Sequence, residues 1–119
     1  MNTKLDKILT EISAGELIDK ITILEIKKVK ISNKDKLFEV EKELKSLNKT
    51  MEKFIPDILQ ISTFKNQLKD INLKLWDIEN GKRLAEKKNE FGEDFILLAR
   101  SVYKANDQRA KIKFDINNI

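Results

Sequence analysis

Residues 15–28 read Gly-Glu-Leu-Ile-Asp-Lys-Ile-Thr-Ile-Leu-Glu-Ile-Lys-Lys, and this stretch decides the fold. On an α-helix Leu17, Ile21 and Leu24 share one face, because residues three and four apart lie on the same side. Ile26 points well away from that face. A surface helix carries one apolar stripe, whereas a helix that is apolar on several sides is buried on several sides. The stretch is therefore predicted to form a central helix with the other helices packed around it.

The composition is typical of long helices. The chain has 119 residues, of which 37% are charged, with only 3 Gly and 1 Pro. This length indicates a single domain over residues 1–119. The chain contains neither Cys nor His, which excludes disulfides and removes the commonest general base and the commonest neutral metal ligand. We therefore expect no catalytic residues, no cofactor and no metal.

Charge and hydropathy patterns place limits on partners and location. Residues 1–12 lack the unbroken apolar core of a signal peptide, and no stretch approaches the ~20 apolar residues of a membrane span. We expect a soluble, cytoplasmic protein. The net charge of +4 is modest, so nucleic-acid binding is not favoured. Weak phosphate-backbone binding through lysines of the first helix–helix turn stays open as an alternative. These are Lys27, Lys28, Lys30, Lys34 and Lys36.

The fold is predicted to be all-α, an antiparallel bundle of about four helices. Residues 1–12 form an irregular lead-in that packs on the bundle. Ser13 and Glu16 have the spacing of a capping box, which starts the first helix. Ser32-Asn33-Lys34-Asp35 provides a second capping signal, which starts the second helix. Gly81 allows a kink in the third helix, and Gly92 is free to take a left-handed conformation in the turn before the fourth. The helices are predicted over about 14–31, 33–55, 58–89 and 93–116.

The second, third and fourth predicted helices are long and coiled-coil-like. Apolar residues recur at alternating spacings of three and four, the pattern of helices that pack at a shallow angle. We expect the second helix to pack back on the third. Narrow apolar rows of this kind often complete their core with another copy, so a homodimer is predicted. The rows are Leu37, Val40, Leu44, Leu47, Met51 and Phe54, then Ile61, Phe64, Leu68, Ile71, Leu75 and Ile78.

Arginine is rare in this chain, which has 24 basic residues but only Arg83, Arg100 and Arg109 as arginines. In a lysine-rich chain an arginine indicates that a planar, bidentate donor is needed. Arg109 is the one charge in the apolar row of the fourth helix. The candidate ligand or partner surface combines the arginines with nearby polar residues. Its members are Asp19, Lys20, Trp76, Glu79, Arg83, Arg100, Tyr103, Asn106, Asp107 and Arg109.

Two interpretations of this set remain open. In one, Asp19, Glu79 or Asp107 forms a salt bridge with an arginine of the fourth helix and fixes the register of the bundle. In the other, the arginines line a pocket between the first, third and fourth helices and hold a phosphate, sugar phosphate or carboxylate. Trp76 is expected to be a partly buried packing residue, and its alternative role is to stack on a sugar ring or base.

Several motif blocks resemble a family of short bacterial and phage proteins of unknown function, and the resemblance spans about 13–117. It implies an all-helical protein that is sometimes encoded beside, or fused to, cell-surface glycan and glycosyltransferase genes. It supplies no catalytic residues. Asn80 stands where the family usually has an acidic residue. The blocks are GELIDKITILEIK at 15–27, LWDIE at 75–79 and FILLARSVY at 95–103, followed by Asn106, Asp107 and Arg109.

The leading functional prediction is a non-catalytic helical interaction or scaffold module with an unidentified protein partner. It depends on the intact apolar rows and on the lack of His and Cys. The alternative is a small-ligand-binding protein or enzyme with an arginine and carboxylate pocket for an anionic ligand.

Overall fold

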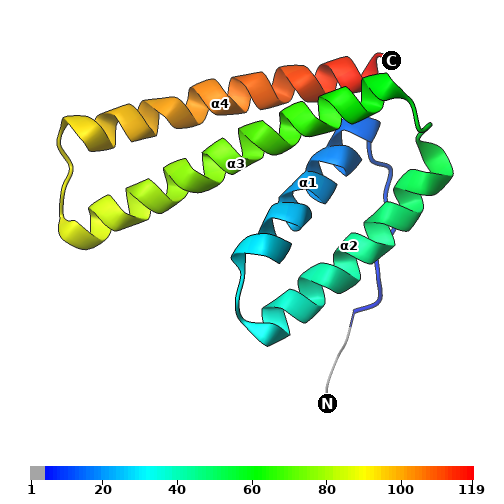
Figure 1. The fold of residues 1–119 in the computed structure, drawn as a ribbon, viewed down its shortest axis with the longest axis horizontal. Helices are drawn as coiled ribbons and strands as arrows, with labels where there is room; N and C mark the ends of the chain where they lie inside the picture. The colour runs from blue at the N-terminus through cyan, green and yellow to red at the C-terminus, as the bar shows by residue number, and fades with distance from the viewer. Residues whose placement is uncertain (1–4) are drawn as a thin grey trace.

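The computed structural model describes residues 5–119 and confirms the predicted all-α class (Figure 1). Four helices and no strand are present in this part of the chain. None of these helices combines the length and apolarity needed to cross a membrane. The helices are α1 (Ala14–Lys30), α2 (Lys34–Phe54), α3 (Leu59–Lys88) and α4 (Glu93–Asn117).

The first helix is central, as its apolar pattern predicts. α1 packs against α2, α3 and α4, and it contributes to both core clusters. Leu17, Ile21 and Leu24 join Val40 and Leu44 of α2 in the first cluster. On another side of α1, Ile18 is fully buried with residues of α3 and α4 in the second cluster. That cluster is Ile18, Ile61, Leu68 and Ile116.

The pairing of the helices differs from the predicted one. α2 packs along α1, and α3 packs along α4, so the fold consists of two antiparallel hairpins that meet at α1 (Figure 1). Among the described residues the backbone of α2 does not approach that of α3, and only the end of α2, at Met51, packs on the core cluster that α3 shares. A heptad row shows that a helix has a partner but not which one, and the apolar stripe of α1 matches the row of α2. Phe54, the last member of that row, is 70% exposed.

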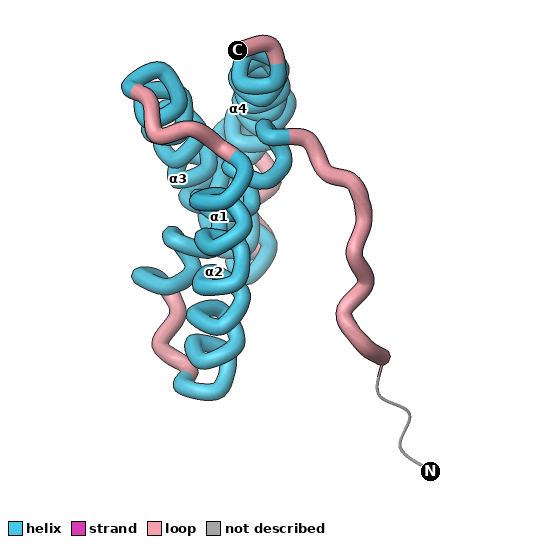
Figure 2. Tube along the Cα trace, turned by 90° about the vertical axis from the view of Figure 1, so that its right-hand side faces the viewer, coloured by secondary structure: helices cyan, strands magenta, loops and turns pink. Residues whose placement is uncertain are grey.

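The predicted packing of the lead-in on the bundle is wrong for the residues that the structure describes. Residues 5–13 have no regular structure and stand clear of the helices in Figure 2. Leu5, Ile8 and Leu9 are each more than 80% exposed. The first turn of α1 is already covered by α2 on one side and by α4 on another. Residues 1–4 lie outside the described part.

Local capping signals are present at both helix starts where they are predicted. The Ser13 hydroxyl accepts a hydrogen bond from the Glu16 amide at 3.2 Å, and the Asn33 side chain accepts one from the Lys36 amide at 3.0 Å. The Glu16 carboxylate does not complete the capping box and instead forms an ion pair with Lys113 of α4. Tertiary packing therefore replaces half of the predicted local motif.

The glycines of the second hairpin have different roles from those predicted. α3 runs through Gly81 without a break, and a Cβ there would lie 3.2 Å from the Leu98 side chain of α4. Gly81 therefore permits close packing of α3 on α4. The left-handed residue of the turn is Asn89, with φ 55° and ψ 37°, whereas Gly92 has φ −80° and begins α4. Asn tolerates this conformation better than most residues, so the prediction for Gly92 is wrong.

The start of α1 lies directly against the end of α4. The Gly15 amide donates a hydrogen bond of 2.7 Å to Oδ1 of Asn117. A Cβ at residue 15 would lie only 2.6 Å from the backbone carbonyl oxygen of Lys113. Gly15 is therefore required by the close approach of two backbones.

We predict that Gly15→Ala lowers the free energy of unfolding by about 1–3 kcal/mol, because the new methyl group meets backbone that cannot move aside alone. Urea denaturation followed by circular dichroism measures this change. Gly81→Ala is the matched control, since its Cβ meets only the flexible end of Leu98. There the gain in helix propensity of about 1 kcal/mol offsets the crowding. Equal stabilities of the two variants would contradict the backbone contact.

Candidate functional site

The most deeply buried charge in the described chain is the carboxylate of Asp19, which is 1% exposed. Arg109, in the apolar row of α4, binds it through two nitrogen atoms. Nε donates to Oδ1 at 2.9 Å and Nη2 donates to Oδ2. This is the bidentate geometry that distinguishes arginine from lysine. The predicted interhelical ion pair between Asp19 and an arginine of the fourth helix is therefore present.

Asn72 of α3 extends this pair into a network of three helices. Its amide nitrogen donates to Oδ1 of Asp19 and to Oγ1 of Thr22, both at 2.9 Å. The Thr22 hydroxyl donates in turn to the backbone carbonyl of Asp19 at 2.7 Å. Every buried side-chain nitrogen or oxygen in residues 5–119 has a hydrogen-bond partner. A fully satisfied network of this kind fixes how its elements meet.

The network determines the charge state of its two ionisable members. Burial raises the pKa of Asp19, but hydrogen bonds from Arg109 and Asn72 and the charges of Arg109 and Lys113 outweigh burial, so the pKa lies below its ordinary value. The hydrogen bond to Asp19 raises the pKa of Arg109 against the opposing effect of burial. Both groups are therefore charged at neutral pH.

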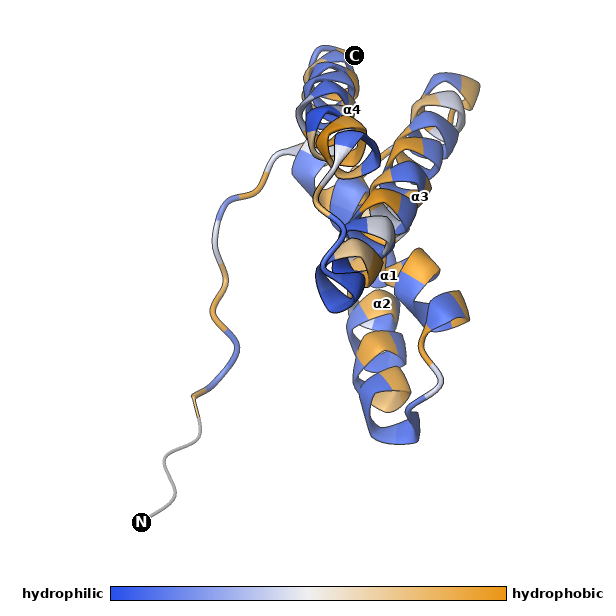
Figure 3. Cartoon of the chain, turned by 90° about the vertical axis from the view of Figure 1, so that its left-hand side faces the viewer, coloured by the Kyte–Doolittle hydropathy of each residue, from blue (hydrophilic) through white to orange (hydrophobic). Residues whose placement is uncertain are grey.

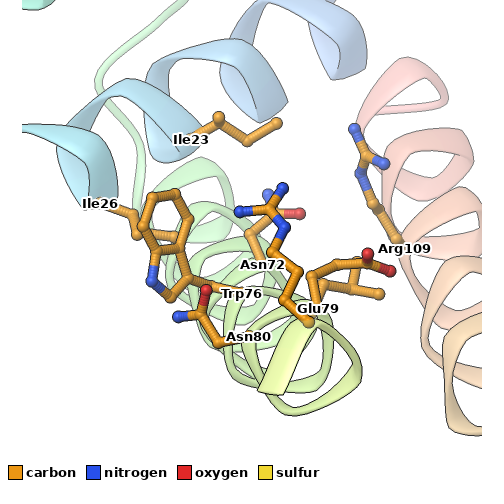
Figure 4. A pocket seen from close by; sticks show the side chains of 9 residues that line it. Ile23, Ile26, Asn72, Trp76, Glu79, Asn80 and Arg109 are labelled. Carbon is orange, nitrogen blue, oxygen red and sulfur yellow. The ribbon is translucent and has the colours of Figure 1, made fainter. Parts of the chain in front are cut away.

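A cavity of about 250 Å³ lies beside the network, in the angle between α1 and α3 (Figure 4). α1 contributes apolar side chains, α3 contributes most of the polar ones, and α4 contributes the Arg109 side chain. The lining residues are Ile23, Ile26, Asn72, Leu75, Trp76, Glu79, Asn80, Arg83 and Arg109.

The groups around the cavity divide into an apolar and a polar side. The half-buried Trp76 ring lies near Ile26 and Asn80 in Figure 4, with Ile23 above the opening. Glu79 forms an ion pair of 3.4 Å with Lys82 on the same helix. Arg83 is exposed and takes part in none of the ion pairs found in residues 5–119. The arrangement can hold a small molecule but brings together no recognisable catalytic set.

The structure assembles half of the predicted surface. Trp76, Glu79, Arg83 and Arg109 line the cavity, and Asp19 lies behind it as the partner of Arg109. The other predicted residues are exposed and line no part of it. They are Lys20, Arg100, Tyr103, Asn106 and Asp107.

Of these outer residues, Asn106 alone touches the network. Its Oδ1 accepts a hydrogen bond of 3.5 Å from Nη1 of Arg109. The predicted set is therefore divided between the cavity, the network, the outside of the second hairpin and, for Lys20, the exposed side of α1.

Sequence analysis missed Asn72 and Thr22 as members of the network. Thr22 lies three residues after Asp19, and this spacing on a helix buried on several sides is a signal that it shares the face of the carboxylate. Asn72 lies beside the apolar row of α3, one turn after Leu68. A polar side chain in such a position is buried and needs a hydrogen-bond partner. Neither signal names the partner, because it lies on another helix.

We predict that Arg109→Leu lowers the free energy of unfolding by about 3–5 kcal/mol, since it leaves the buried Asp19 carboxylate unpaired. Chemical denaturation measures the loss. Lys111→Leu is the control, because Lys111 pairs with Asp115 on the surface of the same helix and should contribute no more than about 0.5 kcal/mol. The double variant Asp19→Asn/Arg109→Leu should be more stable than Arg109→Leu. A double variant that is less stable than Arg109→Leu would contradict the conclusion that the unpaired Asp19 carboxylate causes the loss of stability.

We also predict a loss of stability in acid that originates at Asp19. Its pKa is lower in the folded than in the unfolded protein, so the ion pair contributes fully above the unfolded value of about 4. The contribution disappears as the pH falls through the lower, folded value. Urea midpoints measured from neutral pH to about pH 2 should fall less steeply for Asp19→Asn than for the wild type. Asp107→Asn is the control, and an identical slope in all three proteins would contradict the assignment.

Comparison with known proteins identifies the family. A family model described as a family of unknown function, DUF6165, matches residues 8–119. No curated protein and no solved structure matches the chain. The matched range contains all four helices, the Asp19 network and every residue of the cavity. The resemblance carried by the motif blocks is therefore confirmed, and the chain belongs to this family of unknown function.

Proposed function

We propose that the protein is a helical interaction module that associates with a second copy of itself through the outer part of the α3–α4 hairpin. We call residues 79–104 the outer arm. The observation that carries the proposal is that no residue of the outer arm is buried, although the arm contains the end of α3 and the first half of α4. An arm with exposed apolar residues and no cover is suited to binding another protein.

The lengths of the helices explain why the outer arm has no cover. α3 has 30 residues and α1 has 17, which correspond to about 45 Å and 26 Å. Figure 1 shows the far end of the hairpin extending beyond α1 and α2. In this region each helix has only the other as a neighbour. Two helices from a second copy would give the outer arm the two-layer packing of a helical bundle.

Large apolar side chains are exposed on the outer arm. Figure 3, which views the molecule from the free end of the hairpin, shows hydrophobic residues at the start of α4. Groups of such residues on a surface mark interaction sites. By helical periodicity Leu84 and Leu97 lie on the side of the hairpin opposite α1. The exposed residues are Leu84 (52%), Phe91 (48%), Ile96 (53%), Leu97 (55%) and Tyr103 (53%).

The charges around Leu97 support a second copy as the partner. Asp94, Leu97, Arg100 and Lys104 share one side of α4, with the acid before Leu97 and the bases after it. If two copies of α4 pack antiparallel about a twofold axis at Leu97, Asp94 of each copy lies opposite Arg100 of the other. Such a surface is complementary to itself, as a twofold contact requires.

The proposal predicts a dimer that Leu97→Glu disrupts, because the two new carboxylates would face each other at the twofold contact without partners. Sedimentation equilibrium should give a dimer mass for the wild type and a monomer mass for the variant. Phe114→Glu is the matched control, since Phe114 is 66% exposed on α4 but belongs to the other end of the helix. It should remain dimeric.

A charge reversal tests the orientation of the copies. Asp94→Arg should weaken the dimer, and Asp94→Arg/Arg100→Asp should restore it, because the exchange preserves the pairing between copies. A wild-type protein that is monomeric at high concentration would overturn the proposal. So would a dimer that Leu97→Glu and Phe114→Glu weaken equally.

A further inference from the structure

We propose that the cavity between α1 and α3 is a binding site for a small phosphorylated ring compound, whose phosphate contacts Arg83 and whose ring lies on Trp76. This site is separate from the Leu97 side of the outer arm. It lies on the side of α3 that carries α1, at the base of the arm. The inference therefore does not depend on self-association.

The balance of charges identifies the kind of group that the cavity accepts. Asp19 compensates Arg109, and Lys82 compensates Glu79. Arg83 lines the same cavity, and no ion pair of residues 5–119 compensates it. Arg83 is therefore the one base of the cavity lining that no ion pair of the described residues neutralises. A guanidinium group with free donors binds phosphate in a planar, bidentate geometry.

The apolar side of the cavity provides a surface for a ring. Trp76 is half-buried, so one part of its indole is fixed by packing while another part lines the opening (Figure 4). Ile23 and Ile26 of α1 line the same opening. A planar base stacks on such a face, and the apolar face of a sugar ring packs against it in the same way.

Polar groups on the rim can bind the edge of the ring. The amide of Asn80 can both donate and accept hydrogen bonds, and the Glu79 carboxylate accepts them from hydroxyl groups. Asn72 and Arg109 also line the cavity, and the Asp19 network fixes their positions. Because these side chains are ordered before a ligand binds, binding loses less conformational entropy.

The size of the cavity limits the ligand. Its volume of about 250 Å³ is slightly below the ~300–1,000 Å³ that is usual for ligand pockets. This suits a ligand that places one ring on Trp76 and one phosphate on Arg83. A sugar phosphate and a nucleoside monophosphate share this chemistry.

Trp76 makes the proposal directly testable, because it is the single tryptophan of the chain. Its fluorescence reports on this cavity. We propose titrations with glucose 1-phosphate and with uridine monophosphate, and with glucose, uridine and inorganic phosphate as partial ligands. At least one phosphorylated ring should give a saturable change, and its partial ligands should bind at least tenfold more weakly. The two full ligands distinguish a sugar ring from a base.

Arg83→Ala should weaken this binding by about tenfold or more, as expected when a charge-assisted hydrogen bond is lost. Arg83 is exposed and takes part in no ion pair of residues 5–119, so the variant should keep the circular dichroism spectrum of the wild type. Lys74→Ala, an exposed base elsewhere on α3, is the control and should bind normally. An unchanged spectrum with every compound up to about 10 mM would overturn the proposal. Equal affinity for Arg83→Ala and the wild type would also overturn it.

Discussion

The burial of one carboxylate constrains the whole arrangement. Burying a charge without partners costs more free energy than the whole free energy of unfolding of a domain of this size. Asp19 therefore needs hydrogen-bond donors from neighbouring helices. Arg109 and Asn72 supply them, and they come from α4 and α3. The three helices can satisfy Asp19 together only at one relative position. The apolar packing of Ile18 against Ile116 then agrees with the position that the charges select.

The same constraint shapes the surface around it. With α1 held against α3 and α4 at Asp19, the shorter α1–α2 hairpin covers only part of the longer α3–α4 hairpin (Figure 1). The angle where the two hairpins diverge becomes the cavity, and the uncovered remainder becomes the outer arm. A structural ion pair and an uncovered surface therefore have one origin. The ion pair of the first interpretation and the cavity that the second interpretation requires lie side by side.

The features that sequence analysis predicted correctly are those that adjacent residues determine. The apolar pattern of α1 shows that it is enclosed, the side chains of Ser13 and Asn33 start their helices, and the lone Arg109 in an apolar row indicates a carboxylate partner. The features that it missed depend on the whole fold. The row of α2 fits α1 better than α3, and the polarity of Asn72 acquires its meaning only from Asp19, 53 positions away. Asn89 takes the left-handed conformation because the turn starts there, although a glycine follows nearby.

The contact between Gly15 and Asn117 has a consequence for how the chain acquires its structure during synthesis. The helix at the centre of the fold leaves the ribosome before the other three helices, yet residues near 117 complete its first turn and its second core cluster. The α1–α2 hairpin can assemble first, because its core is local. The side of α1 that carries Ile18 and Asp19 then stays exposed to solvent until α4 has emerged. A nascent chain whose translation stops before α4 would therefore expose this apolar and charged face to chaperones.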